Sequence, residues 1–133
     1  MRAFTRMAAF AGTAFVALTA ATAFAGELKP FETTAFEAAQ QAGNPIVVDI
    51  WASWCPTCAA QEPIVEKLAA SPDFSEVTVF KVDFDKQKDV VQALGAQRQS
   101  TLIAFKGASE TARSVGDTDP ASIETLFRSA LTN

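Results

Sequence analysis

Histidine is absent from this chain of 133 residues, and cysteine is scarce, with only Cys55 and Cys58. A structural zinc ion takes four ligands, usually cysteines and histidines, so we do not expect one within a single chain. A network of disulfides is excluded as well, because two cysteines form only one bridge. A bridge between residues three apart closes a very short loop and adds little stability. A purely structural disulfide remains an alternative, but the pair favours redox chemistry.

Basic residues are also few. The chain has 11 Lys and Arg against 15 Asp and Glu, and two of the basic residues, Arg2 and Arg6, lie in a segment that we expect to be removed. The remainder would carry 9 basic and 15 acidic residues, a net charge of −6. An acidic surface argues against nucleic acid or an anionic membrane as a partner.

The segment that holds these arginines has the pattern of a secretory signal peptide. Residues 7–21 form an apolar, alanine-rich run without charge, and the small-x-small sequence AFA follows at 23–25. We expect cleavage after Ala25, which divides the chain into a signal peptide (1–25) and one domain (26–133). The apolar run is short for a membrane span, so an uncleaved anchor is the less favoured alternative. Export predicts a bacterial periplasmic protein in a compartment that permits disulfides.

The two cysteines follow an apolar strand and begin a helix. Residues 46–51 are apolar apart from Asp49, as in strands that are buried on both faces of a sheet. Pro56 suits the first turn of a helix, where its missing N–H costs nothing. A spacing of three places Cys55 and Cys58 on one face of that helix. The free amides and the dipole of its first turn would stabilise a thiolate at Cys55, so the sequence predicts a redox site.

Apolar runs and turn residues predict the remaining elements. A crossover through the cysteine helix gives parallel pairing, and a hairpin near the end of the chain adds an antiparallel pair. The sequence therefore predicts an α/β domain with a mixed sheet and helices on both faces. Strands are expected over 77–82, 101–105 and 111–115, and helices over 33–41, 55–70, 89–94 and 119–131.

The order of these elements, together with several motifs, resembles the thioredoxin family. The segment VDIWASWCPTC (48–58) is similar to the family's strand and active-site sequence, and Pro63 lies where the family has a helix-kinking proline. The segments KVDFD (81–85) and TLIAFKG (101–107) resemble two further strands of the family, and Gly116 matches its glycine before the last helix.

This resemblance covers about residues 31–131 and implies a three-layer α/β/α fold with a mixed sheet of four to five strands. It implies a thiol–disulfide oxidoreductase that works as a monomer and needs no cofactor. Its partners would be proteins that carry a disulfide or a thiol.

The resemblance also implies roles for individual residues. Cys55 would be the attacking thiolate, and Cys58 would resolve the mixed disulfide, so that Cys55–Cys58 is the redox disulfide. Asp49 matches the buried acid that takes up and returns the proton of the resolving thiol, and its burial predicts a raised pKa. Lys81 matches the partner of that acid. A structural buried pair without catalytic use is the alternative for Asp49 and Lys81.

Trp54 is expected to shield the cysteines and to contact substrate. The residues that the resemblance assigns to substrate binding are Trp54, Pro56, Thr57, Gln99, Ser100, Thr101 and Gly116.

The sequence departs from the family at Ser100, where thioredoxins carry a cis-proline that faces the cysteines. A cis bond before a residue other than proline costs about 3 kcal/mol, so we expect a trans peptide or a strained loop here. The Ser100 hydroxyl could hydrogen-bond the Cys55 thiolate. Without the proline there is also room at Cys55 and Cys58 for a soft metal such as Cu(I), or for a cluster shared between two chains. An ordinary reductase with a tolerated substitution is the alternative.

The dipeptide between the cysteines bears on the direction of the reaction. Strong periplasmic oxidants have a histidine there, whereas Thr57 offers only a hydroxyl, which predicts a more reducing couple. We therefore expect an exported reductant of protein disulfides that receives electrons from a membrane thiol transporter. The alternatives are a copper(I)-binding or metal-delivery protein that uses Cys55 and Cys58 as ligands, and a disulfide donor.

Overall fold

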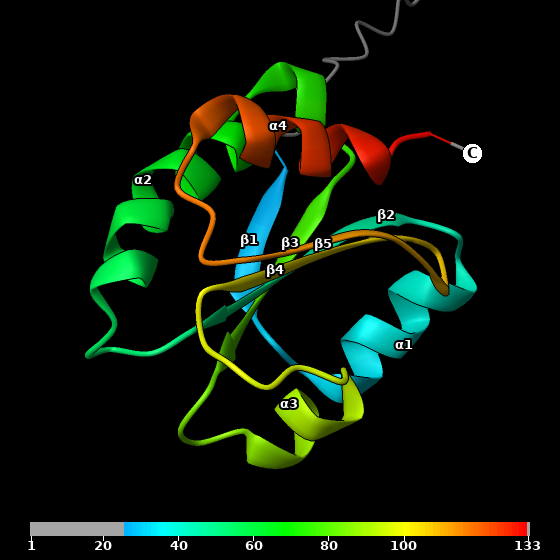
Figure 1. Cartoon of the computed structure of the whole chain (residues 1–133). Coiled ribbons are helices and arrows are strands. Elements are labelled where there is room, and N and C mark those ends of the chain that lie inside the picture. The colour runs from blue at the N-terminus through cyan, green and yellow to red at the C-terminus, as the bar shows by residue number, and fades with distance from the viewer. Residues whose placement is uncertain (1–25, 133) are drawn as a thin grey trace, which may run out of the picture.

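Strand β2 (Pro45–Trp51) lies at the centre of a five-stranded sheet in the computed structural model, which describes residues 26–132 (Figure 1). All its residues except Trp51 are buried, because the sheet is covered on both faces. The strand order is β1-β3-β2-β4-β5. The other strands are β1 (Glu27–Pro30), β3 (Thr78–Asp83), β4 (Thr101–Lys106) and β5 (Ser109–Val115).

The sheet is mixed, as predicted. Strand β3 runs parallel to both β1 and β2, whereas β4 is antiparallel to β2 and to β5. The parallel register pairs Asp49 of β2 with Lys81 of β3, which brings two charged residues of the sequence prediction side by side. Gly107 has a φ of 59° in the tight connection between β4 and β5, a conformation that glycine adopts without steric cost.

Helices cover the two faces of this sheet in pairs (Figure 1). Helices α2 (Pro56–Ala69) and α4 (Pro120–Ser129) pack on one face, where their side chains share a core with Val47. Helices α1 (Thr33–Gln41) and α3 (Lys88–Ala93) lie on the other face, whose core holds Ile46 and Val48. Neighbouring residues of β2 thus enter opposite cores, as a strand requires. The three-layer α/β/α prediction is confirmed.

The start of α4 shows how local sequence sets the boundaries of the elements. Asp119 precedes the helix, and its Oδ2 accepts a hydrogen bond of 2.9 Å from the backbone N–H of Ser122. Pro120 is the first helical residue, where proline is tolerated because that N–H has no partner within the helix. Helix α4 therefore begins where the sequence predicts it.

The predicted signal peptide (1–25) and its cleavage after Ala25 lie outside the described residues, so the division of the chain remains a prediction. Across residues 26–132, no helix has the length and apolar character that a membrane span needs.

Candidate active site

Cys55 lies directly before α2 as its N-cap residue, with extended backbone angles. Its Sγ accepts a hydrogen bond of 3.1 Å from the backbone N–H of Cys58, and the two residues form a disulfide with Cα atoms 5.3 Å apart. Pro56 occupies the first position of the helix. The sulfur of Cys55 is thus next to an amide donor and the positive end of the helix dipole, both of which stabilise a thiolate.

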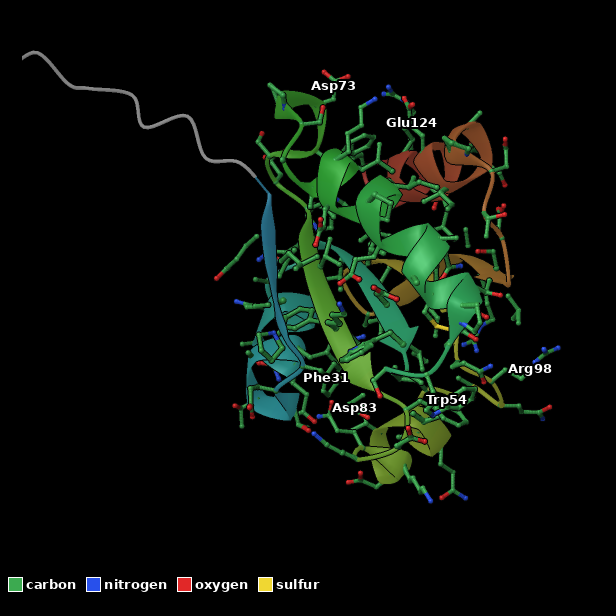
Figure 2. The ribbon with its side chains drawn as sticks, turned by 90° about the vertical axis from the view of Figure 1, so that its left-hand side faces the viewer. Phe31, Trp54, Asp73, Asp83, Arg98 and Glu124 are labelled. Carbon is green, nitrogen blue, oxygen red and sulfur yellow. A yellow bond between two sulfur atoms is a disulfide. The ribbon has the colours of Figure 1, made fainter. Side chains whose placement is uncertain are left out.

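The two cysteines are buried, whereas the neighbouring Trp54 is exposed. Cys55 and Cys58 are only 4% and 6% exposed and pack with Ala52, Trp51 and Phe84. Trp54 is 57% exposed, and its indole Nε1 donates a hydrogen bond of 2.7 Å to Asp85 Oδ2. Figure 2 shows Trp54 at the same end of the molecule as the sulfur atoms. The indole is therefore held at the surface next to Cys55 in the chain, and its contact with substrate remains a prediction.

Asp49 lies behind the cysteines in the middle of β2 and is 5% exposed. Its burial raises its pKa from 3.8 to about 6; the positive charge of Lys81 opposes this shift, and the negative charge of Glu62 adds to it. Asp49 also lines a cavity of about 70 Å³ together with Cys55 and Cys58. A cavity of this size that is lined by charged side chains has room for water, which would provide a path for a proton between the carboxylate and the thiol.

Lys81 does not form an ion pair with Asp49 within residues 26–132; its salt bridge is with Glu62. Lys81 Nζ lies 2.6 Å from Glu62 Oε1 and 4.4 Å from the centroid of the Trp51 ring. The predicted partner of Asp49 therefore acts on it through space. Sequence reasoning missed Glu62, although its position four residues after Cys58, one turn along the same helix face, could have pointed to it.

The segment before β4 takes the place of the family's cis-proline loop. The described residues contain no cis peptide bond, and Ser100 has a φ of 56° in the left-handed region, which is costly for a residue other than glycine. Ser100 is buried, and its hydroxyl donates a hydrogen bond of 2.6 Å to the carbonyl oxygen of Gln99. We expected a trans peptide or a strained loop at Ser100, and the structure shows both. The suggested bond from the hydroxyl to Cys55 is absent from this disulfide form.

Gln61 of α2 connects this loop to the one that follows β5, and sequence reasoning missed it. Its side chain is 1% exposed, and Nε2 donates hydrogen bonds to the carbonyl oxygens of Asp117 at 2.8 Å and Ser100 at 3.3 Å. The N–H of Gly116 donates to the same Ser100 oxygen at 2.8 Å. A polar residue on the inner side of an amphipathic helix was the available signal.

The structure thus brings the two predicted substrate-binding segments, at Ser100 and at Gly116, into direct contact. Thr101 begins β4 and is buried, with its hydroxyl bonded to the carbonyl oxygen of Arg98 at 2.7 Å. Gln99 and Thr57 are half-buried, and Pro56 is exposed. Their contribution to substrate binding remains a prediction.

Comparison with known proteins agrees with this geometry. The family model described as thioredoxin matches residues 27–129. The chain belongs to the thioredoxin family. Thioredoxin-2 of Saccharomyces cerevisiae is 37% identical over 84 residues, which are 63% of this chain and 78% of that protein. The thioredoxin of Chlamydia muridarum is 36% identical over 86 residues, 65% of this chain and 82% of that protein.

Solved structures of the family agree as well. The crystal structure of Trxlp from Edwardsiella tarda has a TM-score of 0.73 and 40% identity, and the match covers 75% of this chain and 98% of that one. A mutant thioredoxin from Halobacterium salinarum has a TM-score of 0.72 and 26% identity, with 84% and 97% covered. With its paired cysteines at disulfide distance, this thioredoxin-family protein is a thiol–disulfide oxidoreductase that acts on protein disulfides.

Proposed function

We propose that this thioredoxin-family protein is an exported reductant of protein disulfides, with Cys55 as the attacking and Cys58 as the resolving residue. The observation that carries the assignment is the place of Cys55 at the N-terminus of α2. Cys55 Sγ accepts a hydrogen bond from the backbone N–H of Cys58, which stabilises a thiolate at Cys55. Both cysteines line the cavity that holds the buried carboxylate of Asp49, so a base is at hand for the thiol of Cys58.

The exchange balances over two steps. The Cys55 thiolate attacks one sulfur of the substrate disulfide, a Cys55–substrate bond forms, and the second substrate sulfur leaves as a thiolate that takes a proton. Asp49 then accepts the proton of the Cys58 thiol, and Cys58 attacks Cys55 Sγ. The remaining substrate sulfur leaves as a thiolate and is protonated, so that the substrate gains two electrons and two protons while Cys55 and Cys58 become a disulfide.

The residue between the two cysteines supports the reducing direction. Thr57 carries no charge that would stabilise the reduced form of the couple, so the disulfide should be a poor oxidant. A reductant that works outside the cytoplasm needs its own source of electrons, and a membrane thiol transporter would supply them. The protein would act as a monomer in the periplasm. It would begin at Gly26 after cleavage of the signal peptide, and mass spectrometry of the secreted protein tests this cleavage site.

The reduction potential of the Cys55/Cys58 couple tests the direction. Metal-free protein is equilibrated in glutathione buffers, and the two redox forms are separated after alkylation. A value at or below about −230 mV, in the range of glutaredoxins and thioredoxins, supports the reductant. A value near about −120 mV, like that of the strong periplasmic oxidant, would make the protein a disulfide donor. Stoichiometric copper on the purified protein, lost in Cys55→Ser, would favour metal delivery instead.

A further inference from the structure

Glu62 is a second carboxylate at the cavity that connects Asp49 with Cys58. It extends from α2, lines the same cavity of about 70 Å³, and has a side chain that is 48% exposed. Asp49, by contrast, is buried. Glu62 therefore stands where the cavity meets solvent, in a salt bridge with the lysine that the family resemblance assigns to Asp49.

The ammonium group of Lys81 is held by a salt bridge with Glu62. Lys81 begins in register with Asp49 on the neighbouring parallel strand, but Nζ lies 2.6 Å from Glu62 Oε1 and over the ring of Trp51 at 4.4 Å. A lysine side chain has four flexible carbons, so without Glu62 this ammonium is free to move toward Asp49, whose pKa its charge already lowers. A close ion pair would make Asp49 a weaker base.

Two other charged side chains and the two cysteines line the cavity of Asp49. Lys81 comes from β3, and Glu62, Cys55 and Cys58 come from α2 and its N-cap. From β4, the residue in register with Asp49 is the apolar Leu102. Glu62 and Lys81 are thus the two charged side chains that line the Asp49 cavity within the described residues.

We propose that Glu62 is a positioning residue for the resolving step: by holding the Lys81 ammonium at the mouth of the cavity, it leaves the Asp49 carboxylate free to take the Cys58 proton. In that step the Sγ–H bond of Cys58 breaks, its proton goes to Asp49, and its electron pair forms the bond to Cys55. The substrate sulfur leaves Cys55 with the electrons of the broken bond. Glu62 touches none of the reacting atoms and acts through Lys81.

The proposal concerns the two-step exchange itself and holds for either direction of electron flow. A first experiment follows the carboxyl carbon of Asp49 by NMR across pH in the disulfide form, which needs no substrate or electron donor. Glu62→Gln should move the titration midpoint down by about one pH unit, because it removes a nearby negative charge and releases Lys81 toward Asp49. Glu66→Gln is the matched control, since it removes an exposed carboxylate one turn further along α2 and should leave the midpoint in place.

A second experiment separates the role of Lys81 from a simple charge effect. The double variant Glu62→Gln/Lys81→Met should return the midpoint toward or above that of the native protein, because the competing cation is gone. Release of the second substrate thiol is followed in single turnover at saturating disulfide and should be about threefold slower in Glu62→Gln. When the rate of this release is plotted against pH, its fall on the acidic side should occur at a lower pH in the variant. Equal midpoints in Glu62→Gln and Glu66→Gln would overturn the proposal, as would a double variant that behaves like Glu62→Gln alone.

Discussion

Replacing Asp49 by asparagine should stabilise the protein, because the native carboxylate is ionised at neutral pH in a place that disfavours charge. Burial raises the pKa of Asp49 from 3.8 to about 6. Each unit of such a difference corresponds to about 1.4 kcal/mol between the two protonation states. At neutral pH the ionised side chain therefore costs the folded state about 3 kcal/mol relative to the unfolded chain. Asparagine has the same shape and no charge, so this cost disappears.

The sign of the effect sets its pH dependence. Below about pH 3.8 the carboxyl group is protonated in both states, and the two proteins should be nearly equal in stability. As the pH rises through about 4 to 6, the unfolded chain loses its proton first, so the native protein loses stability relative to the variant. Above about pH 7 the difference is complete.

Urea unfolding of the disulfide forms at pH 4 and pH 7.5 measures this difference. We expect the free energy of unfolding of Asp49→Asn to exceed that of the native protein by less than about 1 kcal/mol at pH 4 and by about 3 kcal/mol at pH 7.5. The slope of this free energy against urea concentration should be unchanged. The same variant should resolve mixed disulfides more slowly, because Cys58 loses its proton acceptor. Equal gains at both pH values, or no gain at pH 7.5, would refute the argument from burial.

Substitutions at three further positions probe the loops and the core. Gln61→Met should destabilise the protein by about 1–2 kcal/mol, because Asp117 and Ser100 lose a buried donor; it should raise the KM for a disulfide peptide more than it lowers kcat, and an unchanged KM would contradict this role. Ser100→Val should cost about 2 kcal/mol in thermal unfolding, since a branched side chain tolerates a φ of 56° poorly, whereas Ser100→Gly should stay within about 1 kcal/mol of the native protein. Phe127→Ala should cost about 3–5 kcal/mol in urea, because this side chain is fully buried against Phe74; a smaller loss would show that the core collapses around the cavity.

The sheet and the position of the cysteines could be predicted from the sequence because their signals are local. The apolar run that ends at Trp51 is short and rich in β-branched residues, which favours a buried strand, and the Cys-Pro start of the next helix follows from the chemistry of a helix N-terminus. Asp49 stood out as a lone charge in that run. Its burial and raised pKa follow from the same pattern.

The contacts between elements could not be read in the same way. The pairing of Lys81 with Glu62 depends on the orientation of helix α2 relative to strand β3. The amino-acid sequence alone does not give this orientation. Gln61 looked like one more polar residue on a helix, yet its amide connects the loops at Ser100 and Asp117. The backbone of Ser100 is likewise set by those tertiary bonds, since its own side chain disfavours a positive φ.

Trapping of a mixed disulfide in single-cysteine variants tests directly which cysteine attacks the substrate. Reduced Cys58→Ser and Cys55→Ser proteins are each mixed with a disulfide peptide, and the covalent products are identified by mass spectrometry. We predict that Cys58→Ser accumulates a peptide bound through Cys55, while Cys55→Ser accumulates little. Faster trapping through Cys58 would contradict the assignment of Cys55 as the attacking thiolate and Cys58 as the resolving thiol.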